Sequence, residues 1–193
     1  TSLVESKSGE RGIFNRVSAQ KQAQSTGRRD PNYDFGTNPC SEIILRPHQF
    51  CNLTEVVVRN EDKDEDLIRK VKIATILGTA QSTLTKFPYL RKIWQYNTQE
   101  ERLLGVSLTG IMDNILTNGK LVDMDKRLTN LKQVAIDTNR EYAEKFGIQP
   151  STAITCVKPS GTVSQLCDSA SGIHARHSQY YIRTVRGDNK DPL

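Results

Sequence analysis

The sequence predicts an α/β fold with mostly parallel strands, because stretches of strand character alternate with stretches of helical periodicity. β-Branched and apolar runs of strand length occupy residues 52–59, 103–110 and 152–157. Between them, apolar residues recur every three or four positions over residues 64–85 and 123–146, which is the period of an α-helix. No repeat with a period of about 20–50 residues is present, so the sequence does not indicate a solenoid or a propeller.

The lead-in, residues 1–37, has little regular pattern and is rich in Ser, Gly, Gln and Arg. We expect a helix over residues 17–24, which Gly27 would end. A loop follows, and the pair Arg28 and Arg29 within it is typical of a solvent-exposed segment.

Two strand-like runs, residues 42–45 and 52–59, flank a turn that contains Pro47 and His48. Two strands joined in this way can project the preceding loop away from the sheet. We interpret His48 as a turn residue and not as a catalyst.

The helix over residues 64–85 opens with three acidic side chains, which the helix dipole favours at an N-terminus, and Pro88 bounds it. A second, short helix is expected over residues 89–96, with Trp94 covering the core.

The strand at 103–110 contains two glycines and is expected to lead into a helix at 111–116. The clearest helix covers 123–146, with Asp123 as its N-cap and Gly147 as its C-cap.

Near the end of the sequence, the strand-like run 152–157 enters a turn that contains Gly161, and residues 163–166 can begin a helix. A strand, a Gly-containing turn and a helix N-terminus together present free N–H groups to an anion, so this pattern indicates a phosphate site. The glycine spacing of a Walker P-loop is absent. Residues 177–185 alternate in polarity and predict one further strand.

The charge, hydropathy and cysteine content of the chain exclude several classes of function. The 193 residues include 27 basic and 22 acidic side chains, a net charge of +5 that is spread along the chain, so we expect no direct nucleic-acid binding. No apolar run has the length of a membrane span and no signal peptide is recognisable, so we expect a cytoplasmic protein without a membrane partner. The four cysteines have neither Cys-x-x-Cys nor zinc-site spacing, which predicts no metal site and favours thiols used for chemistry in a reducing compartment.

Asn38, Cys40 and Glu42 form the candidate reaction centre, in which a thiol lies two residues after an amide and two before a carboxylate. If this segment is extended, the three side chains point in the same direction, because directions alternate along a strand. The alternative is a loop with a buried cysteine, since a free cysteine is usually an inert small hydrophobe. The residue types leave both interpretations open.

The sequence Asn-Pro-Cys-Ser-Glu-Ile at residues 38–43 resembles the finger loop of ribonucleotide reductase large subunits. The eleven-residue step from Cys40 to Cys51 resembles the monomeric, adenosylcobalamin-dependent class II enzymes. Lys-Pro-Ser-Gly-Thr-Val-Ser at residues 158–164 resembles the substrate-phosphate loop of this family, and residues 8–15 resemble a segment upstream of its finger. The three blocks follow the family order and cover nearly the whole chain.

For the fold, this resemblance implies part of a ten-stranded α/β barrel, consisting of the finger loop and much of the second half. The chain, residues 1–193, would be a fragment of one catalytic barrel domain, with residues 38–51 as the finger loop and residues 52–193 as the second half-barrel, including the phosphate loop 158–164. An open half-barrel exposes sheet edges and apolar faces, so we expect the rest of the same enzyme to be its partner.

For function, the resemblance implies radical-based reduction of ribonucleoside triphosphates to 2′-deoxyribonucleotides, with adenosylcobalamin as cofactor and a thioredoxin-type thiol reductant. Cys40 would carry a transient thiyl radical and Glu42 would act as general base. Asn38 would hold a ribose hydroxyl, and Cys51 would be one of two redox-active thiols.

The resemblance also assigns the substrate phosphates to four residues of the phosphate loop: Ser160, Gly161, Thr162 and Val163. Cys156 and Cys167 do not match the place of the second redox thiol, and we interpret them as packing residues.

Two alternatives remain. One is a class I large subunit, which shares the Asn-x-Cys-x-Glu pattern but uses a separate metal-containing radical subunit. The other is a non-catalytic α/β module that binds phosphate or nucleic acid and whose cysteines are structural. The position of Cys40, at a loop tip or inside a packed core, separates this module from the enzyme.

Overall fold

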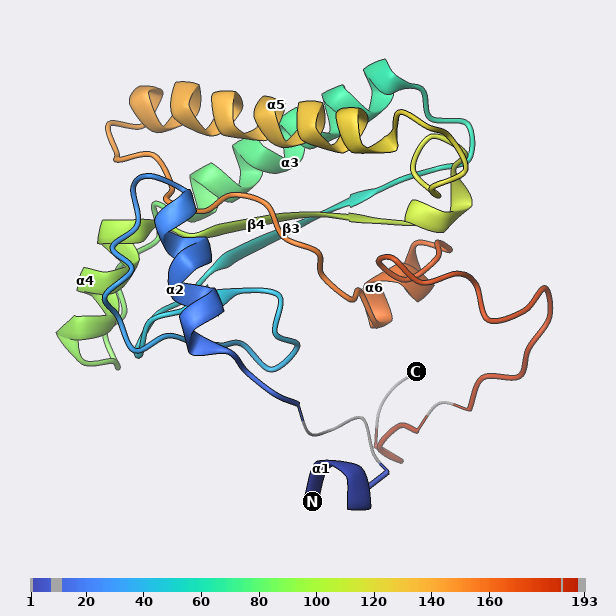
Figure 1. Cartoon of the computed structure of the whole chain (residues 1–193), viewed down its shortest axis with the longest axis horizontal. Coiled ribbons are helices and arrows are strands. Elements are labelled where there is room, and N and C mark those ends of the chain that lie inside the picture. Colours follow the sequence, from blue (N-terminus) through green and yellow to red (C-terminus); the bar gives the residue numbers. More distant parts are fainter. Residues whose placement is uncertain (1, 8–11, 185, 191–193) are drawn as a thin grey trace.

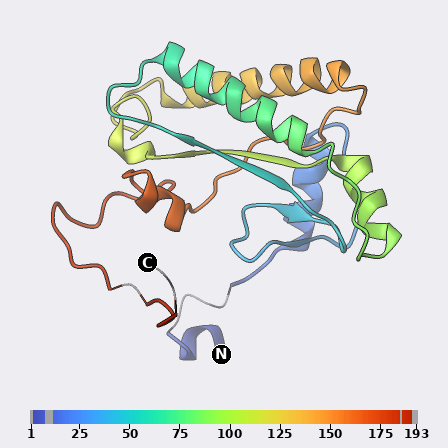
Figure 2. The same ribbon diagram turned by 180° about the vertical axis from the view of Figure 1, so that it is seen from behind.

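The computed structural model describes residues 2–7, 12–184 and 186–190. In chain order, its helices and strands are α1 (Ser2–Glu5), α2 (Arg16–Ser25), β1 (Gly36–Thr37), β2 (Ile44–Leu45), β3 (Asn52–Val57), α3 (Asp64–Gln81), α4 (Lys92–Glu101), β4 (Leu104–Thr109), the 3-10 turn η1 (Ile111–Asp113), α5 (Met124–Lys145) and α6 (Thr162–Leu166). Figure 1 and Figure 2 show the long helices α3 and α5 lying side by side over one face of β3 and β4. The predicted α/β class is confirmed.

The central sheet is parallel, as predicted. β3 and β4 pair along their whole length, with Asn52 opposite Leu104 at one end and Val57 opposite Thr109 at the other. Residues 153–156 run beside the far edge of β4, where Thr155 forms a parallel bridge with Val106. The expected third strand is therefore present as a short, bridged segment.

The helices α3 and α5 bury their apolar stripes against the outer face of this sheet. The N-terminus of α3 is closed by Asp66, whose carboxylate accepts a hydrogen bond from the backbone N–H of Lys63. After the C-terminus of α5, Gly147 takes the left-handed backbone conformation, with φ of 65°, that commonly ends a helix. The buried apolar residues of this core are Val56, Val58, Leu67, Val71, Ala74, Leu104, Val106, Leu131, Ala135 and Ile154.

A second, smaller core supports the hairpin of β1 and β2. β1 and β2 form a short antiparallel hairpin, and Phe35, directly before it, is completely buried against Ala19 and Ala23 of α2. The helix predicted for the lead-in is thus confirmed, and its structural role is to cover the base of this hairpin.

Arg29 is buried and not solvent-exposed as predicted. Its guanidinium forms a two-pronged ion pair with Glu101 of α4, at 2.8 and 2.9 Å, and donates to the backbone carbonyl of Ile44 in β2. Arg46 reaches the same carboxylate at 3.0 Å, and Gln49 donates to it as well. The sequence alone suggested a solvent-exposed loop, because Glu101, the counter-charge of Arg29, lies 72 residues away in the chain.

Three further local predictions are corrected. The segment after β4 is the single 3-10 turn η1 and not a helix to residue 116. The short helix α4 begins later than expected and continues to Glu101. Residues 177–184 form no strand, while residue 185 and the resemblance block at 8–11 lie outside the described residues.

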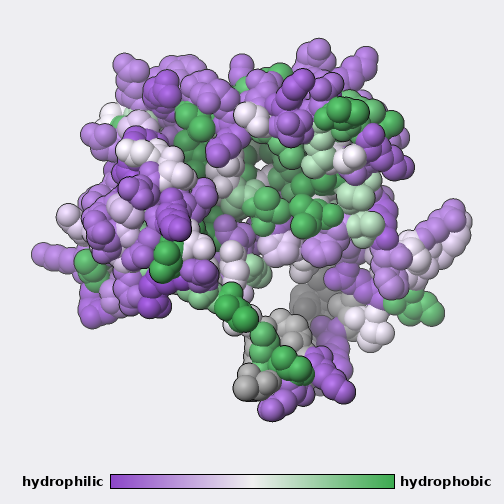
Figure 3. Space-filling model, in the orientation of Figure 1, coloured by the Kyte–Doolittle hydropathy of each residue, from purple (hydrophilic) through white to green (hydrophobic). Residues whose placement is uncertain are grey.

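Apolar side chains gather in the middle of the face shown in Figure 3, below α5. Here β4, α5 and the bridged segment line a cavity of about 260 Å³, whose apolar lining includes Val106, Leu131, Val157 and Ile173. Among the described residues, no helix is long and apolar enough to cross a membrane.

The buried network generates a stability prediction. Glu101→Gln keeps the side-chain shape but leaves Arg29 and Arg46 without their shared counter-charge, so we expect the free energy of unfolding to fall by about 3–5 kcal/mol. The matched control is Glu141→Gln, which breaks an exposed pair with Lys145 and should change stability little. Urea unfolding of both variants measures the difference, and equal stabilities would contradict a structural role for the buried network.

Candidate active site

Residues 38–43 form the turn of the β1–β2 hairpin and are not extended. The side-chain oxygen of Asn38 accepts the Ile43 N–H at 3.0 Å, and the Asn38 carbonyl accepts the Ser41 N–H at 2.9 Å. Ser41 adopts the left-handed conformation with φ of 63°. The predicted alternation of side chains is therefore wrong, and the reversal at Ser41 separates the directions of Cys40 and Glu42.

Cys40 is exposed at the tip of this turn, where its thiol is free. The alternative of an inert, buried cysteine is thereby excluded for Cys40. A thiol at this position can be reached from outside the segment.

Glu42, in contrast, has a side chain that is only 1% exposed. Its Oε1 lies 3.3 Å from the Lys158 ammonium, and its Oε2 has no hydrogen-bond partner among the described residues. Burial alone would raise the pKa of Glu42. Hydrogen bonds from its own backbone N–H and from the Asn38 amide, together with the Lys158 charge, outweigh burial and hold this pKa below its ordinary value.

Cys51 and Cys156 share the environment of this carboxylate. Both are partly buried, and burial, reinforced by the negative charge of Glu42, raises the pKa of the Cys51 thiol and raises that of Cys156 to about 12. The Cys156 sulfur packs against Gly105 of β4, where an added Cβ would lie 3.0 Å from it. The packing role predicted for Cys156 agrees with this contact.

The phosphate loop follows the bridged segment directly. The backbone N–H of Lys158 donates to the Ser107 hydroxyl of β4 at 2.9 Å, which fixes the start of the loop. Ser160 is buried, and its hydroxyl has no partner among the described residues. Gly161, Thr162 and Val163 are exposed, and α6 begins at Thr162, so the predicted helix start is confirmed, whereas residues 158–161 are irregular and form no regular turn.

The Lys158–Glu42 pair is what joins the two candidate loops. Sequence reasoning missed it, because the partners are 116 residues apart and neither motif indicates the other.

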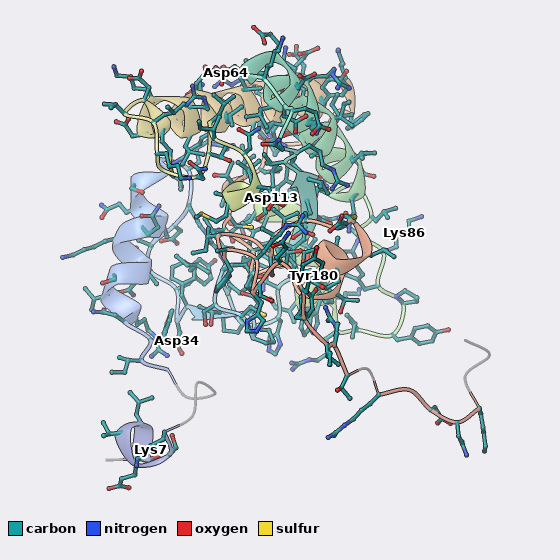
Figure 4. The ribbon with its side chains drawn as sticks, turned by 90° about the vertical axis from the view of Figure 1, so that its right-hand side faces the viewer. Lys7, Asp34, Asp64, Lys86, Asp113 and Tyr180 are labelled. Atoms are coloured by element: carbon teal, nitrogen blue, oxygen red, sulfur yellow. The ribbon has the colours of Figure 1, made fainter. Side chains whose placement is uncertain are left out.

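Asp113 and Arg176 hold the segment that follows α6 and were also missed. Figure 4 shows Asp113 in the middle of the molecule, where its carboxylate accepts the Ala170 N–H at 2.8 Å. Arg176 pairs with Asp113 at 2.9 Å and with Asp168 at 2.7 Å. Burial would raise the pKa of Asp113, but the hydrogen bonds from Arg176 and from the Ala170 N–H outweigh burial and hold this pKa below its ordinary value. The Asp113 carboxylate is therefore ionised at neutral pH. Within the described part of the chain, no group of three or more His, Cys, Asp or Glu side chains could hold a metal ion.

Comparison with known proteins finds similarity to ribonucleotide reductases. No model of a protein family matches the chain. The adenosylcobalamin-dependent ribonucleoside-triphosphate reductases of Lacticaseibacillus paracasei and Levilactobacillus brevis are each 30% identical to it, over 99% and 96% of the chain and over 29% and 28% of their own lengths. A probable enzyme of the same name from Dictyostelium discoideum is 33% identical over 79% of the chain and 20% of its own length.

A solved structure is also similar. The crystal structure of a B12-dependent (class II) ribonucleotide reductase matches 72% of the chain with a TM-score of 0.58 and 27% identity, over 22% of that protein. The chain thus spans less than a third of the length of the relatives it matches. These similarities identify the chain as a homologue of the adenosylcobalamin-dependent ribonucleoside-triphosphate reductases that corresponds to part of these enzymes.

Proposed function

We propose that this chain supplies the radical-bearing finger loop and the phosphate loop of an enzyme that reduces ribonucleoside triphosphates to 2′-deoxyribonucleotides. The observation that carries the proposal is the linkage of the two loops. An exposed thiol at Cys40 is two residues from a buried carboxylate, Glu42, which is ion-paired with Lys158 at the start of the phosphate loop. The names and the fold of the relatives support the same activity.

The chemistry explains why these residue types are needed. Hydroxide is a poor leaving group, so the ribose 2′-hydroxyl is not displaced directly. A thiyl radical at Cys40 takes the hydrogen atom from the 3′-carbon and becomes a thiol, and the 2′-hydroxyl of the resulting ribose radical then leaves as water. Two electrons and two protons from a pair of thiols reduce the sugar, one of the protons leaves with the water, and Cys40 returns its hydrogen atom to the 3′-carbon.

Glu42 and Asn38 act on the ribose hydroxyls. The Oε2 atom of Glu42 has no partner among the described residues, so it is free to accept the proton of the 3′-hydroxyl. The side-chain oxygen of Asn38 is occupied by the Ile43 N–H, and one N–H of its NH₂ group donates to Glu42, which leaves the other N–H to donate to a ribose oxygen.

Adenosylcobalamin, when bound, supplies the radical by cleavage of its cobalt–carbon bond. The exposure of Cys40 at the hairpin tip fits a radical source that approaches from outside this segment. We assign no other residue of this chain to the cofactor.

Cys51 is one of the two reducing thiols in this proposal. Its raised pKa keeps it protonated at neutral pH, so it can donate a hydrogen as well as electrons. The second thiol is contributed by the rest of the same enzyme, and a thioredoxin-type protein reduces the disulfide formed. All four cysteines are free in the structure, which fits a location in the reducing cytoplasm.

The substrate phosphates would bind at Ser160, Gly161, Thr162 and Val163. An added Cβ at Gly161 would meet no atom within 4 Å, so an anion has room to approach the backbone there. The hydroxyl of Thr162 and the N–H groups at the start of α6 supply donors.

We also propose that the chain forms part of a ten-stranded α/β barrel completed by the rest of the enzyme. Residues 38–51 would be its finger loop, residues 52–193 would belong to its second half, and residues 1–37 would be the lead-in. The apolar cavity between β4 and α5 supports this arrangement, because such a face is normally covered.

Substitution of the two finger cysteines tests the radical mechanism. In the complete enzyme, Cys40→Ser should reduce turnover below detection while nucleotide binding stays nearly unchanged, because the O–H bond is too strong to yield the radical. Cys51→Ser should lose multiple turnover with thioredoxin but retain hydrogen exchange at the 3′-carbon. Substantial reduction by the Cys40 variant in a deoxynucleotide assay would rule out the assignment.

Alkylation of the thiols tests their environments. At pH 8, iodoacetamide should modify Cys40 first and Cys156 last, because the thiolate is the nucleophile and the pKa of Cys156 is about 12. The rate at Cys156 should rise about tenfold per pH unit between pH 7.5 and 9.5. Mass spectrometry of the peptides measures both rates, urea-unfolded protein is the control, and equal rates in the folded protein would contradict the structure.

Gly161→Val tests the phosphate site. The side chain should block the anion but meets open space in the protein, so the fold should tolerate it. We expect the dissociation constant of the nucleotide to rise by about tenfold, equivalent to about 1.4 kcal/mol, with little change for the nucleoside. Gly187→Val, also in open space, is the matched control for titration calorimetry. Equal weakening for nucleotide and nucleoside would mean that Gly161 serves the fold.

A further inference from the structure

Lys158 occupies the position between the candidate base and the phosphate loop. Its ammonium lies 3.3 Å from Glu42, and the next three residues of the chain lead into the loop at Gly161. The Lys158 side chain is 30% exposed, whereas that of Glu42 is 1% exposed. The ammonium is therefore the more exposed partner of this pair.

The backbone of Lys158 is held on both sides. Its N–H donates to the buried Ser107 hydroxyl, and its carbonyl packs so closely on Gly172 that a Cβ there would approach it to 2.6 Å. With the backbone fixed, only the flexible side chain can redirect the charge.

Lys158 is also the cation available to Glu42. The other titratable groups that face this carboxylate are the thiols of Cys51 and Cys156, which are neutral at pH 7 because their pKa values are raised. Arg29 lines the same cavity of about 210 Å³ as Glu42, but its guanidinium is occupied by Glu101. Glu42 therefore depends on Lys158 for its charge compensation.

We propose that Lys158 is shared between Glu42 and the substrate phosphate, so that a seated phosphate draws the ammonium away from the carboxylate. This inference rests on the proposed function and adds a residue to it. A phosphate carries more charge than a carboxylate and forms charge-assisted hydrogen bonds with ammonium groups, so it competes for Lys158. Glu42 then loses its neighbour and becomes a stronger proton acceptor only when a nucleotide occupies the site.

The sign of the effect follows from the ion pair. The Lys158 charge lowers the pKa of Glu42, so removal of that charge, by substitution or by a phosphate, raises this pKa. In the Lys158→Met variant, the pKa of Glu42 should therefore be raised already in the free enzyme.

The pH dependence of steady-state reduction by the complete enzyme separates the two states, because kcat/KM reports the free enzyme and kcat the substrate complex. In Lys158→Met, the acid limb of kcat/KM should move to higher pH. The acid limb of kcat should stay in place, since the phosphate has already removed the ammonium in the wild type. Lys158→Arg, which keeps the charge, should restore the wild-type profile of kcat/KM.

Lys126→Met, at an exposed position of α5, is the matched control for the loss of one lysine and should change neither profile. If both limbs move together in Lys158→Met, the ammonium stays on Glu42 in the complex and the sharing is refuted. If neither limb moves, Lys158 does not act on Glu42 at all and the proposal is equally overturned.

Calorimetry gives a readout that does not depend on turnover. Nucleotide binding to the wild type should take up protons on the acidic side of neutrality, because the pKa of Glu42 rises on binding, and the corresponding nucleoside should cause no uptake. Lys158→Met should lose this uptake and raise the dissociation constant of the nucleotide by about tenfold. An unchanged uptake in the variant would refute the sharing. Absence of reduction by the wild type, with the uptake present, would refute the proposed function alone.

Discussion

The position of the β1–β2 hairpin, which carries Cys40, depends on the buried carboxylate of Glu101. Glu101 lies between Arg29 of the lead-in and Arg46 at the end of β2, and none of the three side chains is more than 3% exposed. Buried charges are tolerated only when each has a partner of opposite charge. Because Glu101 pairs with both arginines, the lead-in, the hairpin and α4 are held in one relative arrangement. The tip of the finger can be exposed and still be held in place, because its base is fixed by these charges and by the burial of Phe35.

β4 is the surface on which the two candidate loops meet. Gly105 has no side chain, and the space beside it is filled by Leu53, Ile43 and the sulfur of Cys156, with the nearest atom only 2.4 Å from where a Cβ would lie. Two residues further along the strand, Ser107 holds the start of the phosphate loop. A close approach at one position and a hydrogen bond at the other bring Glu42 and Lys158 into contact. The glycine is therefore needed for packing across the strand and not for a special backbone conformation.

What the sequence could predict was local. The periodicity of α3 and α5, and the strand runs of β3 and β4, depend on residues close in the chain, and all four elements are confirmed. The burial of Arg29 and the partner of Glu42 depend on groups 72 and 116 residues away, which periodicity cannot reveal. The turn at Ser41 was missed for another reason, since a serine with positive φ is uncommon and leaves no mark in the pattern. Resemblance to a family indicated the candidate reactive residues but said nothing of these contacts.

The turn itself has a chemical consequence. An extended segment would have directed Cys40 and Glu42 to one side. The reversal at Ser41 instead leaves the thiol exposed at the tip, as the proposed radical chemistry requires, and buries the side chain of Glu42. Burial opposes the negative charge of this carboxylate, and its own backbone N–H, the Asn38 amide and the Lys158 ammonium together hold its pKa low, so that it is ionised and can accept a proton. Lys158 supplies its charge from the loop that would hold the substrate phosphates in the proposed enzyme.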